Sequence, residues 1–192
     1  MGRVVFDTSM SLDGYMTAAN RTPEEPMGPG GLRLMDWAFN DERGAQVLRD
    51  GVAGLGAAIA GRETYDTSLP WWGANGPSGD ARMPLFVVTH KAPDTSPENG
   101  VYTFVTDGIE SALEQAQKVA GDRDVCVMGG ANLGQQYIAA GLVDELSIHL
   151  VPVLFHGGTR MFAHLGVDHT DLEVLDVVST PAATHFRYAI KK

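Results

Sequence analysis

The residues best placed for chemistry are the glycine pair Gly129-Gly130, which stands between an apolar run over residues 124–128 and an amphipathic stretch over residues 133–140. A glycine turn between a buried strand and a helix lets the backbone approach a ligand, and the N–H groups and positive dipole end of the helix attract a phosphate. The pattern Gly-x-Ala-x-x-Gly that starts at Gly129 is close to a dinucleotide fingerprint, although the acidic ribose partner about 20 residues further on is missing. The turn predicts an anion site, and a tight turn without a ligand is an equally open interpretation.

A second glycine turn, Gly61-Arg62-Glu63-Thr64-Tyr65, repeats this arrangement at the end of another apolar run. Arg62 could bind a phosphate bidentately and Thr64 could donate a hydrogen bond, although a lone arginine in a first helical turn is more often simply exposed. Thr89-His90-Lys91 ends a third apolar run with a polar, partly basic edge. Because open α/β sheets bind ligands outside the carboxyl ends of their strands, the three edges together favour a dinucleotide of the NADP type.

Other catalytic chemistries lack their residues. A single cysteine, Cys126, excludes the cysteine-rich zinc site of nucleobase deaminases, and the six histidines form no His-Glu-x-x-His motif. There is no Gly-Lys-Ser/Thr phosphate loop and no Gly-x-Ser-x-Gly elbow. We therefore predict no metal site.

Aromatic and histidine side chains offer further candidates. Trp37, Trp71 and Phe155 are expected to contact a substrate. For the two tryptophans, a position at an edge of the core is an equally good interpretation. His149 lies within an apolar run and is expected to be a satisfied core or groove residue rather than a ligand.

Reduction of a polarised C=N or C=O bond needs a proton as well as a hydride, and a buried carboxyl group with a raised pKa suits the proton-donating role. Asp36 is the first candidate, followed by Asp13 and Glu145. Asp13 is more simply explained as a turn residue that bonds its own backbone. Glu145 is more simply explained as the partner of an arginine or backbone group at the start of a strand.

The chain that carries these residues has the size and composition of one globular domain, spanning residues 1–192, with 44% hydrophobic and 20% charged residues. Its formal net charge of -10 disfavours nucleic acid and anionic membrane surfaces as partners. No apolar run resembles a signal peptide or reaches the roughly 18 residues of a membrane span, and one cysteine forms no internal disulfide. We expect a cytoplasmic protein with a small-molecule substrate, no nucleic-acid partner and no membrane association.

The elements that must position these residues follow from hydrophobic periodicity. Strands are expected over residues 3–6, 55–60, 84–90, 101–106, 124–128, 146–154, 172–178 and 185–190, and helices over 36–52, 62–68, 109–120 and 133–140. Asp41 is a candidate N-cap, Pro70 is expected to end the second helix, and residues 19–31 form a long loop of the kind that often closes over a ligand. This alternation predicts an α/β fold, in which a mostly parallel sheet is covered on both faces and has an antiparallel C-terminal edge.

Several motifs in a fixed order carry a family resemblance. They are Ser11-Leu12-Asp13-Gly14-Tyr15, Gly61-Arg62-x-Thr64-Tyr65, Gly129-Gly130, Gly141-Leu142-Val143-Asp144-Glu145-Leu146 and Gly157-Gly158-x-Arg160-Met161-Phe162. With these motifs the whole chain resembles the dihydrofolate reductase superfamily, and more closely the stand-alone relatives of the C-terminal reductase domain of the bifunctional riboflavin-biosynthesis deaminase-reductase. The resemblance implies a three-layer sandwich with an eight-stranded, mostly parallel sheet, NADPH as the cofactor, and a homodimer formed through the C-terminal strands.

The resemblance also assigns residues to the cofactor. Gly61, Arg62 and Thr64, with Tyr65 beside them, would meet the adenosine-side phosphates; Thr89, His90 and Lys91 would lie near the 2′-phosphate; Gly129, Gly130, Ala131, Asn132 and Leu133 would cradle the pyrophosphate. Residues 9–16 would lie along the nicotinamide, and the loop 19–31 would close over the substrate.

Two departures from the family pattern leave the substrate open. Leu34-Met35-Asp36-Trp37 is not a clean match to the carboxylate-bearing helix start of folate-reducing members. Ser68-Leu69-Pro70 stands where riboflavin-pathway reductases carry an acidic pair before a proline. The expected function is an NADPH-dependent reductase of a C=N or C=O bond in a small heterocycle, similar to 5-amino-6-(5-phosphoribosylamino)uracil reductase. A dihydrofolate reductase and a non-catalytic nucleotide-binding protein are the alternatives.

Overall fold

The computed structural model describes residues 1–166 and 168–191. The strands are β1 (Val4–Ser11), β2 (Tyr15–Thr17), β3 (Leu55–Gly61), β4 (Leu85–Val88), β5 (Tyr102–Val105), β6 (Asp124–Met128), β7 (Glu145–Val151), β8 (Thr159–Arg160), β9 (Leu172–Ser179) and β10 (Thr184–Ile190). The α-helices are α1 (Asp36–Phe39), α2 (Glu42–Ala53), α3 (Arg62–Trp72), α4 (Ile109–Ala120) and α5 (Ala131–Ala139), and short 3-10 helices cover Gly31–Met35, Gly73–Asn75 and Gly79–Ala81.

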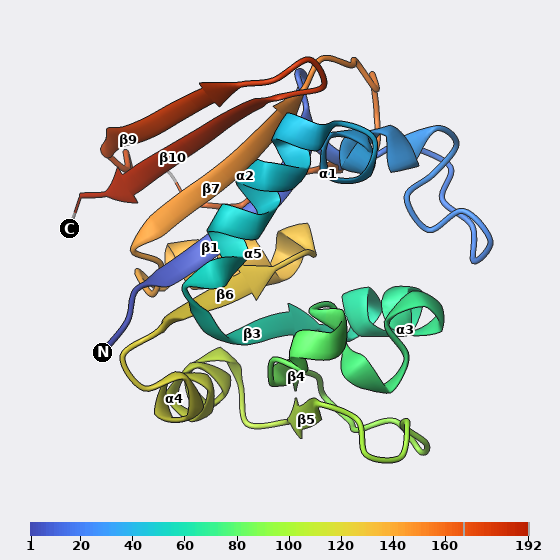
Figure 1. Ribbon diagram of the computed structural model, residues 1–192, viewed down its shortest axis with the longest axis vertical. Helices are drawn as coiled ribbons and strands as arrows, with labels where there is room; N and C mark the ends of the chain where they lie inside the picture. The colour runs from blue at the N-terminus through green and yellow to red at the C-terminus, as the bar shows by residue number, and fades with distance from the viewer. Residues whose placement is uncertain (167, 192) are drawn as a thin grey trace.

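The main sheet has eight strands in the order β5-β4-β3-β6-β1-β7-β10-β9. The strands from β5 to β7 run parallel, whereas β10 is antiparallel to β7 and β9 is antiparallel to β10. The prediction of a mostly parallel eight-stranded sheet with an antiparallel C-terminal edge is therefore confirmed (Figure 1). The register sets Asp7 of β1 beside Met128 of β6 on one side and Ser147 of β7 on the other.

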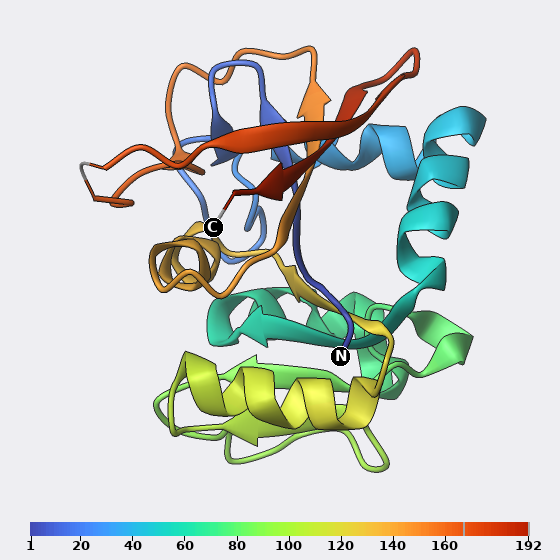
Figure 2. The same cartoon turned by 90° about the vertical axis from the view of Figure 1, so that its left-hand side faces the viewer.

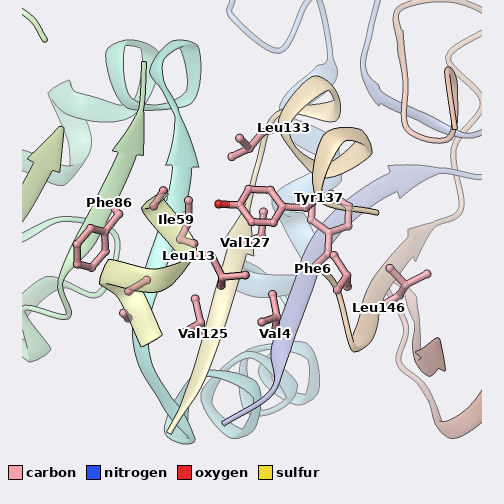
Figure 3. Packing of buried hydrophobic residues seen from close by; sticks show 14 of the residues in the cluster. Val4, Phe6, Ile59, Phe86, Leu113, Val125, Val127, Leu133, Tyr137 and Leu146 are labelled. Atoms are coloured by element: carbon pink, nitrogen blue, oxygen red, sulfur yellow. The ribbon is translucent and has the colours of Figure 1, made fainter. Parts of the chain in front are cut away.

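Helices cover both faces of this sheet. Figure 2 shows α5 on one side of the strands and α2 on the other side. The largest core lies under α4 and α5, where strand residues such as Phe6, Ile59 and Val127 meet Leu113 and Tyr137 (Figure 3). The phenol of Tyr137 donates to the backbone oxygen of Ile109 at 2.7 Å, which fixes α5 to the start of α4. No helix in the described part of the chain is long and apolar enough to cross a membrane.

The opposite face is packed less completely. Tyr65 of α3 lies against Ala58, Ala60 and Cys126, but α2 buries only Gly44 among its own residues. The helix predicted over residues 36–52 is in fact two helices, because the chain leaves the helical conformation at Asn40 and Asp41. Asp41 begins α2 as predicted, and its carboxylate accepts a hydrogen bond from the backbone N–H of Arg43 at 3.1 Å.

The end of α3 and a small second sheet also differ from the prediction. Pro70 lies inside α3 rather than ending it, and the helix continues to Trp72. So close to the helix end, proline removes a single hydrogen bond, and the turn around it still packs Leu69 and Trp72 on the sheet. The small antiparallel sheet of β2 and β8 was not predicted, because three- and two-residue strands carry no periodicity.

Candidate active site

The two glycine turns lie side by side at the carboxyl ends of neighbouring parallel strands, β3 and β6. Gly129 and Gly130 both have left-handed backbones, with φ of 62° and 69°. A Cβ built on Gly129 would lie 2.8 Å from Cγ2 of Thr64, and one on Gly130 would lie 3.3 Å from Oγ1 of Thr64. Glycine is therefore needed at Gly129 both for its conformation and for the close approach of α3.

Both helices that start here present free backbone N–H groups. Neither the N-cap of α3, Gly61, nor the N-cap of α5, Gly130, makes a side-chain capping hydrogen bond. The N–H groups of a first helical turn have no acceptor within the helix. The N-termini of α3 and α5 therefore both present hydrogen-bond donors and the positive end of a helix dipole at the carboxyl edge of β3 and β6. This arrangement fits the phosphates of a dinucleotide, as does the absence of a Cβ at the turn. The side chains of Ala131 and Leu133 are buried, and Asn132 is exposed.

Arg62 joins the turn of α3 to the third predicted edge. Its Nε lies 2.8 Å from both carboxylate oxygens of Asp66, and its Nη1 donates to the backbone oxygen of Lys91 at 2.9 Å. Thr89 Oγ1 donates to the same oxygen at 2.8 Å, and His90 and Lys91 are exposed. The structure thus brings the residues 61–64, 89–91 and 129–133 to one edge of the sheet.

A cavity of about 470 Å³ opens beside the first turn of α5. Ala131 and Asn132 line it together with Tyr15, Arg160 and His164. The guanidinium of Arg160 lies 4.7 Å from the ring centroid of Tyr15. Arg160 had no assigned role in the sequence, because a single cation in a glycine-rich loop gives no sign of which helix it will face.

The long loop predicted over residues 19–31 crosses toward α3. The guanidinium of Arg21 pairs with the carboxylate of Glu63 and donates through Nε to the backbone oxygen of Pro26 at 2.6 Å. The loop is therefore fastened to the helix whose N-terminus borders the two glycine turns.

Asp13, a predicted proton donor, holds two loops together instead. It accepts hydrogen bonds from Ser11 Oγ at 2.6 Å and from the backbone N–H groups of Phe155 and His156 at 3.1 and 2.8 Å. The Ser11 hydroxyl, followed by these two N–H groups, lowers the pKa of Asp13 to about 2. Asp13 is therefore ionised at neutral pH, and its bonds to Ser11 and to the loop after β7 fit the simpler explanation of a turn residue better than proton donation.

Glu145 lies at the wrong end of the sheet for the predicted role. It is the first residue of β7, whereas the glycine turns follow the last residues of β3 and β6. Its buried carboxylate accepts hydrogen bonds from Arg3 and Arg187, each at 2.5 Å. The simpler explanation, an arginine partner at a strand start, is the one that the structure supports.

Asp36, the first of the three candidates, begins α1 next to Trp37. Its side chain is exposed and accepts a hydrogen bond from Asn40 Nδ2 at 3.1 Å. It lies at the surface rather than in the buried setting that the role was expected to need.

The three aromatic residues predicted to contact a substrate occupy different surroundings. Trp37 is 2% exposed, and its Nε1 donates to Ser9 Oγ at 2.9 Å, so its ring has almost no surface left for a ligand. Trp71 is 71% exposed in the last turn of α3, roughly 14 Å along the helix axis from the glycine turn. Phe155 is half-buried in the core around Leu34.

Tyr65 is a core residue rather than a cofactor contact. It is buried, and its ring packs edge-on against Tyr102 and Phe104 at centroid distances of 4.9 and 5.1 Å. Its hydroxyl, buried without a hydrogen-bond partner in the described structure, faces away from water.

A polar cluster that the sequence did not reveal lies on the α2 side of the sheet. His149 Nε2 is 3.2 Å from Asp7 Oδ2, and its Nδ1 is 2.8 Å from Nδ1 of His185. The side chain of Asp7 is 38% exposed although β1 is a central strand. The sheet is therefore not packed closed over Asp7, and we call this opening over Asp7 and Ser147 the Asp7 recess. Alternating polar residues at Asp7, Ser9 and Ser11 were the available signal.

Solved structures share this fold. A putative riboflavin biosynthesis protein from Shewanella sp. PV-4 superposes with a TM-score of 0.72 and 18% identity, covering 99% of both chains. The diaminohydroxyphosphoribosylaminopyrimidine deaminase/5-amino-6-(5-phosphoribosylamino)uracil reductase of Thermotoga maritima gives 0.71 and 12% identity, over 99% of this chain but 57% of that longer one. A pyrimidine reductase-like protein from Corynebacterium diphtheriae gives 0.65 and 13%, covering 100% and 92% of the two chains.

Sequence comparison gives the family. The uncharacterized protein YyaP of Bacillus subtilis is 24% identical over 169 residues, which are 83% of this chain and 80% of that protein. The family model for the RibD C-terminal domain matches residues 3–186. The resemblance expected from the motifs is thus confirmed, and this chain belongs to the RibD C-terminal domain family, whose members are reductase-like domains.

Proposed function

We propose that this protein is an NADPH-dependent reductase that transfers hydride to a C=N or C=O bond of a small heterocyclic substrate. The observation that carries the proposal is the contact between Gly129 and Thr64, which sets two uncapped helix N-termini side by side on adjacent parallel strands. Membership of a family of reductase-like domains supports the reaction class.

Three groups of residues would bind different phosphate groups of the cofactor. The backbone N–H groups of residues 131–133 would hold the pyrophosphate, and the first turn of α3, with Gly61 and Thr64, would hold the adenosine-side phosphate. Arg62 and the turn of residues 89–91 would supply the positive charge for a 2′-phosphate. The cofactor, when bound, supplies the hydride, while the protein positions it and excludes water.

The substrate would lie over the carboxyl end of β1, next to residues 9–16. Asp13 keeps this segment in place through Ser11 and the loop after β7. A phosphoribosyl pyrimidine, the substrate class in the name of the Thermotoga reductase, is the first to test. The segment Ser68-Leu69-Pro70, which departs from the riboflavin-pathway pattern, lies within α3.

The exposed apolar edge strand β9 favours the proposal that this protein forms a homodimer. Leu172, Val174, Leu175 and Val177 are each at least 41% exposed, and the outer side of β9 has no neighbouring strand among the described residues. A long apolar edge of this kind is an aggregation hazard unless it is covered, and a second copy can cover it. The single cysteine, Cys126, is buried, which suits the reducing cytoplasm that we propose as its location.

Titration with NADPH and NADH, followed by nicotinamide fluorescence, tests the proposal. We expect saturable binding that is tighter for NADPH, and oxidation of bound NADPH when 5-amino-6-(5-phosphoribosylamino)uracil is added. Binding of neither dinucleotide would refute the reductase. Turnover of dihydrofolate that depends on Asp36 would instead favour a dihydrofolate reductase, and tight binding without oxidation by pyrimidine, pterin or carbonyl compounds would favour a nucleotide-binding protein without catalysis.

A further inference from the structure

Five side chains form a continuous polar chain from the surface to the Asp7 recess. Asp41, at the N-terminus of α2, is close enough to Thr180 for the Thr180 hydroxyl to lower its pKa. Thr180 Oγ1 donates to the backbone oxygen of Ala183 at 3.2 Å and lies 3.4 Å from Nε2 of His185. The Nδ1 atoms of His185 and His149 are 2.8 Å apart, and His149 Nε2 is 3.2 Å from Asp7 Oδ2. The residues come from three strands, one hairpin turn and one helix cap, so only the tertiary fold assembles them.

The middle of this chain is sealed and its ends are open. His149 and His185 are each 4% exposed. The ring of Trp37 covers both, with centroids 3.9 Å from His149 and 4.9 Å from His185, and its bond to Ser9 fixes the ring there. Asp41, by contrast, lines a surface cavity of about 570 Å³, and Asp7 is open to the recess. Protons could therefore enter at one end and leave at the other without water between them.

The charges around the two imidazoles suit transfer. Burial, and then the positive charge that His149 can carry, lower the pKa of His185 to about 4, while Asp41 and Asp7 oppose this effect. Burial raises the pKa of Asp7, but the charge and hydrogen bond of His149 outweigh burial and leave it lowered, and Thr180 lowers the pKa of Asp41. Both end carboxylates therefore rest ionised, while the pKa of Cys126 is raised by burial and by Asp7. At neutral pH His185 is thus a neutral imidazole with one donating and one accepting nitrogen, which is what a relay requires.

The inner end of the chain lies next to the proposed cofactor site. Asp7 pairs across the sheet with Met128, the residue immediately before Gly129. A bound dinucleotide and substrate would cover the carboxyl edge of β1 and β6. Bulk water would then be kept from the substrate atom that needs a proton. The five side chains that pass through the sheet would offer that proton another route.

We propose that Asp41, Thr180, His185, His149 and Asp7 form a proton relay that supplies the reduction proposed above, on which this inference rests. Reduction adds a hydride from the reduced nicotinamide to carbon, moves the π electron pair to nitrogen or oxygen, and leaves that atom needing one proton. A proton arriving at Asp41 passes to Thr180 as the Thr180 hydroxyl turns from the backbone oxygen of Ala183 and gives its own proton to His185 Nε2. The His185 Nδ1 proton then passes to His149 Nδ1, and the His149 Nε2 proton passes to Asp7. Asp7 rests as a carboxylate and holds this proton only in transit from His149 to the substrate atom, so one proton enters for each one consumed. Asp7 is the catalytic residue, and the other four are positioning residues.

The first test needs no substrate and uses long-range ¹H–¹⁵N spectra of the histidine side chains across a pH series. We expect Asp41→Asn to change the titration and tautomer ratio of His185, and Asp7→Asn to change those of both His149 and His185. Asparagine caps a helix as well as aspartate does, so Asp41→Asn keeps α2 intact. His169→Gln, at an exposed position, is the matched control. Signals of His149 and His185 that respond to neither variant would overturn the relay.

The second test measures NADPH oxidation with 5-amino-6-(5-phosphoribosylamino)uracil or dihydrofolate as the acceptor. We expect His185→Gln to lower kcat by about 100-fold and Asp41→Asn to lower it less, with KM for the acceptor little changed and a changed solvent isotope effect. An equal kcat for His185→Gln and the wild type, or a loss of activity only in Asp36→Asn, would overturn proton delivery by the relay and leave the proposed reductase standing. No turnover by the wild type, together with no NADPH binding, would refute the reductase itself, and proton delivery with it.

Discussion

Acid should destabilise this protein through His185, because its buried imidazole resists protonation. The pKa of His185 falls from 6.5 to about 4 through burial and the charge of His149, so between these pH values the unfolded chain binds a proton that the folded chain does not. The stabilisation is complete above pH 6.5 and is lost as the pH falls toward 4. The difference of about 2.5 units corresponds to roughly 3 kcal/mol in the free energy of unfolding.

Urea unfolding of the wild type and His185→Gln, at closely spaced pH values from neutral to about 4, measures this contribution. Glutamine does not titrate, so the stability advantage of the wild type should shrink by roughly 3 kcal/mol across the series, at up to about 1.4 kcal/mol per pH unit. His169→Gln should follow the wild type. Parallel curves for the wild type and His185→Gln would show that His185 titrates alike in both states, and would refute the reasoning.

Substitutions elsewhere test the cofactor site, the core and the sheet edge. Arg62→Ala should weaken NADPH binding by about 1–3 kcal/mol, because a charged donor is lost. Asp66→Asn, which frees Arg62 from its ion pair, should not weaken binding. Identical Kd values for Arg62→Ala and the wild type in a fluorescence titration would show that Arg62 does not bind the cofactor. Gly134→Ala should lower the free energy of unfolding in urea by about 1–3 kcal/mol, since the new Cβ would lie 2.3 Å from Cζ of Phe6; unchanged stability would mean that α5 can shift from β1. Val174→Lys should sediment as a monomer where the wild type sediments as a dimer, and a monomeric wild type would contradict the proposed dimer.

Much of the fold was predictable because the signals are local. The helix over Ile109–Ala120 and the strand over Asp124–Met128 have the predicted bounds, since glycine and charged residues mark both ends of each apolar pattern. The helix predicted over residues 36–52 divides because Asp41 caps a new helix, and this cap signal lies inside the continuous apolar pattern that predicts one helix. Pro70 is tolerated in α3 because packing of the last turn outweighs one missing hydrogen bond.

The candidate site was predictable where it depends on strand ends and not where it depends on pairing between distant strands. Parallel strands place their carboxyl ends at one edge, so the turns at Gly61 and Gly129 could be expected to meet. The contact of His149 with His185 depends on the register of β7 against β10, which a single sequence does not reveal. The ion pairs of Glu145 could not be predicted for the same reason, because its partners Arg3 and Arg187 lie near opposite ends of the chain.

The central position of β1 has a consequence for biosynthesis. This strand is made before the other strands of the sheet, yet its two neighbours, β6 and β7, begin at residues 124 and 145. At about 5–20 residues per second, β1 waits roughly 6 to 25 s before its first partner is translated. The segment from β3 to α4 can collapse during that time, because its strands pair locally. The backbone N–H and C=O groups of β1 therefore have no strand partner until residues 124–151 have been made, so this strand completes its pairing after the local strands have formed theirs.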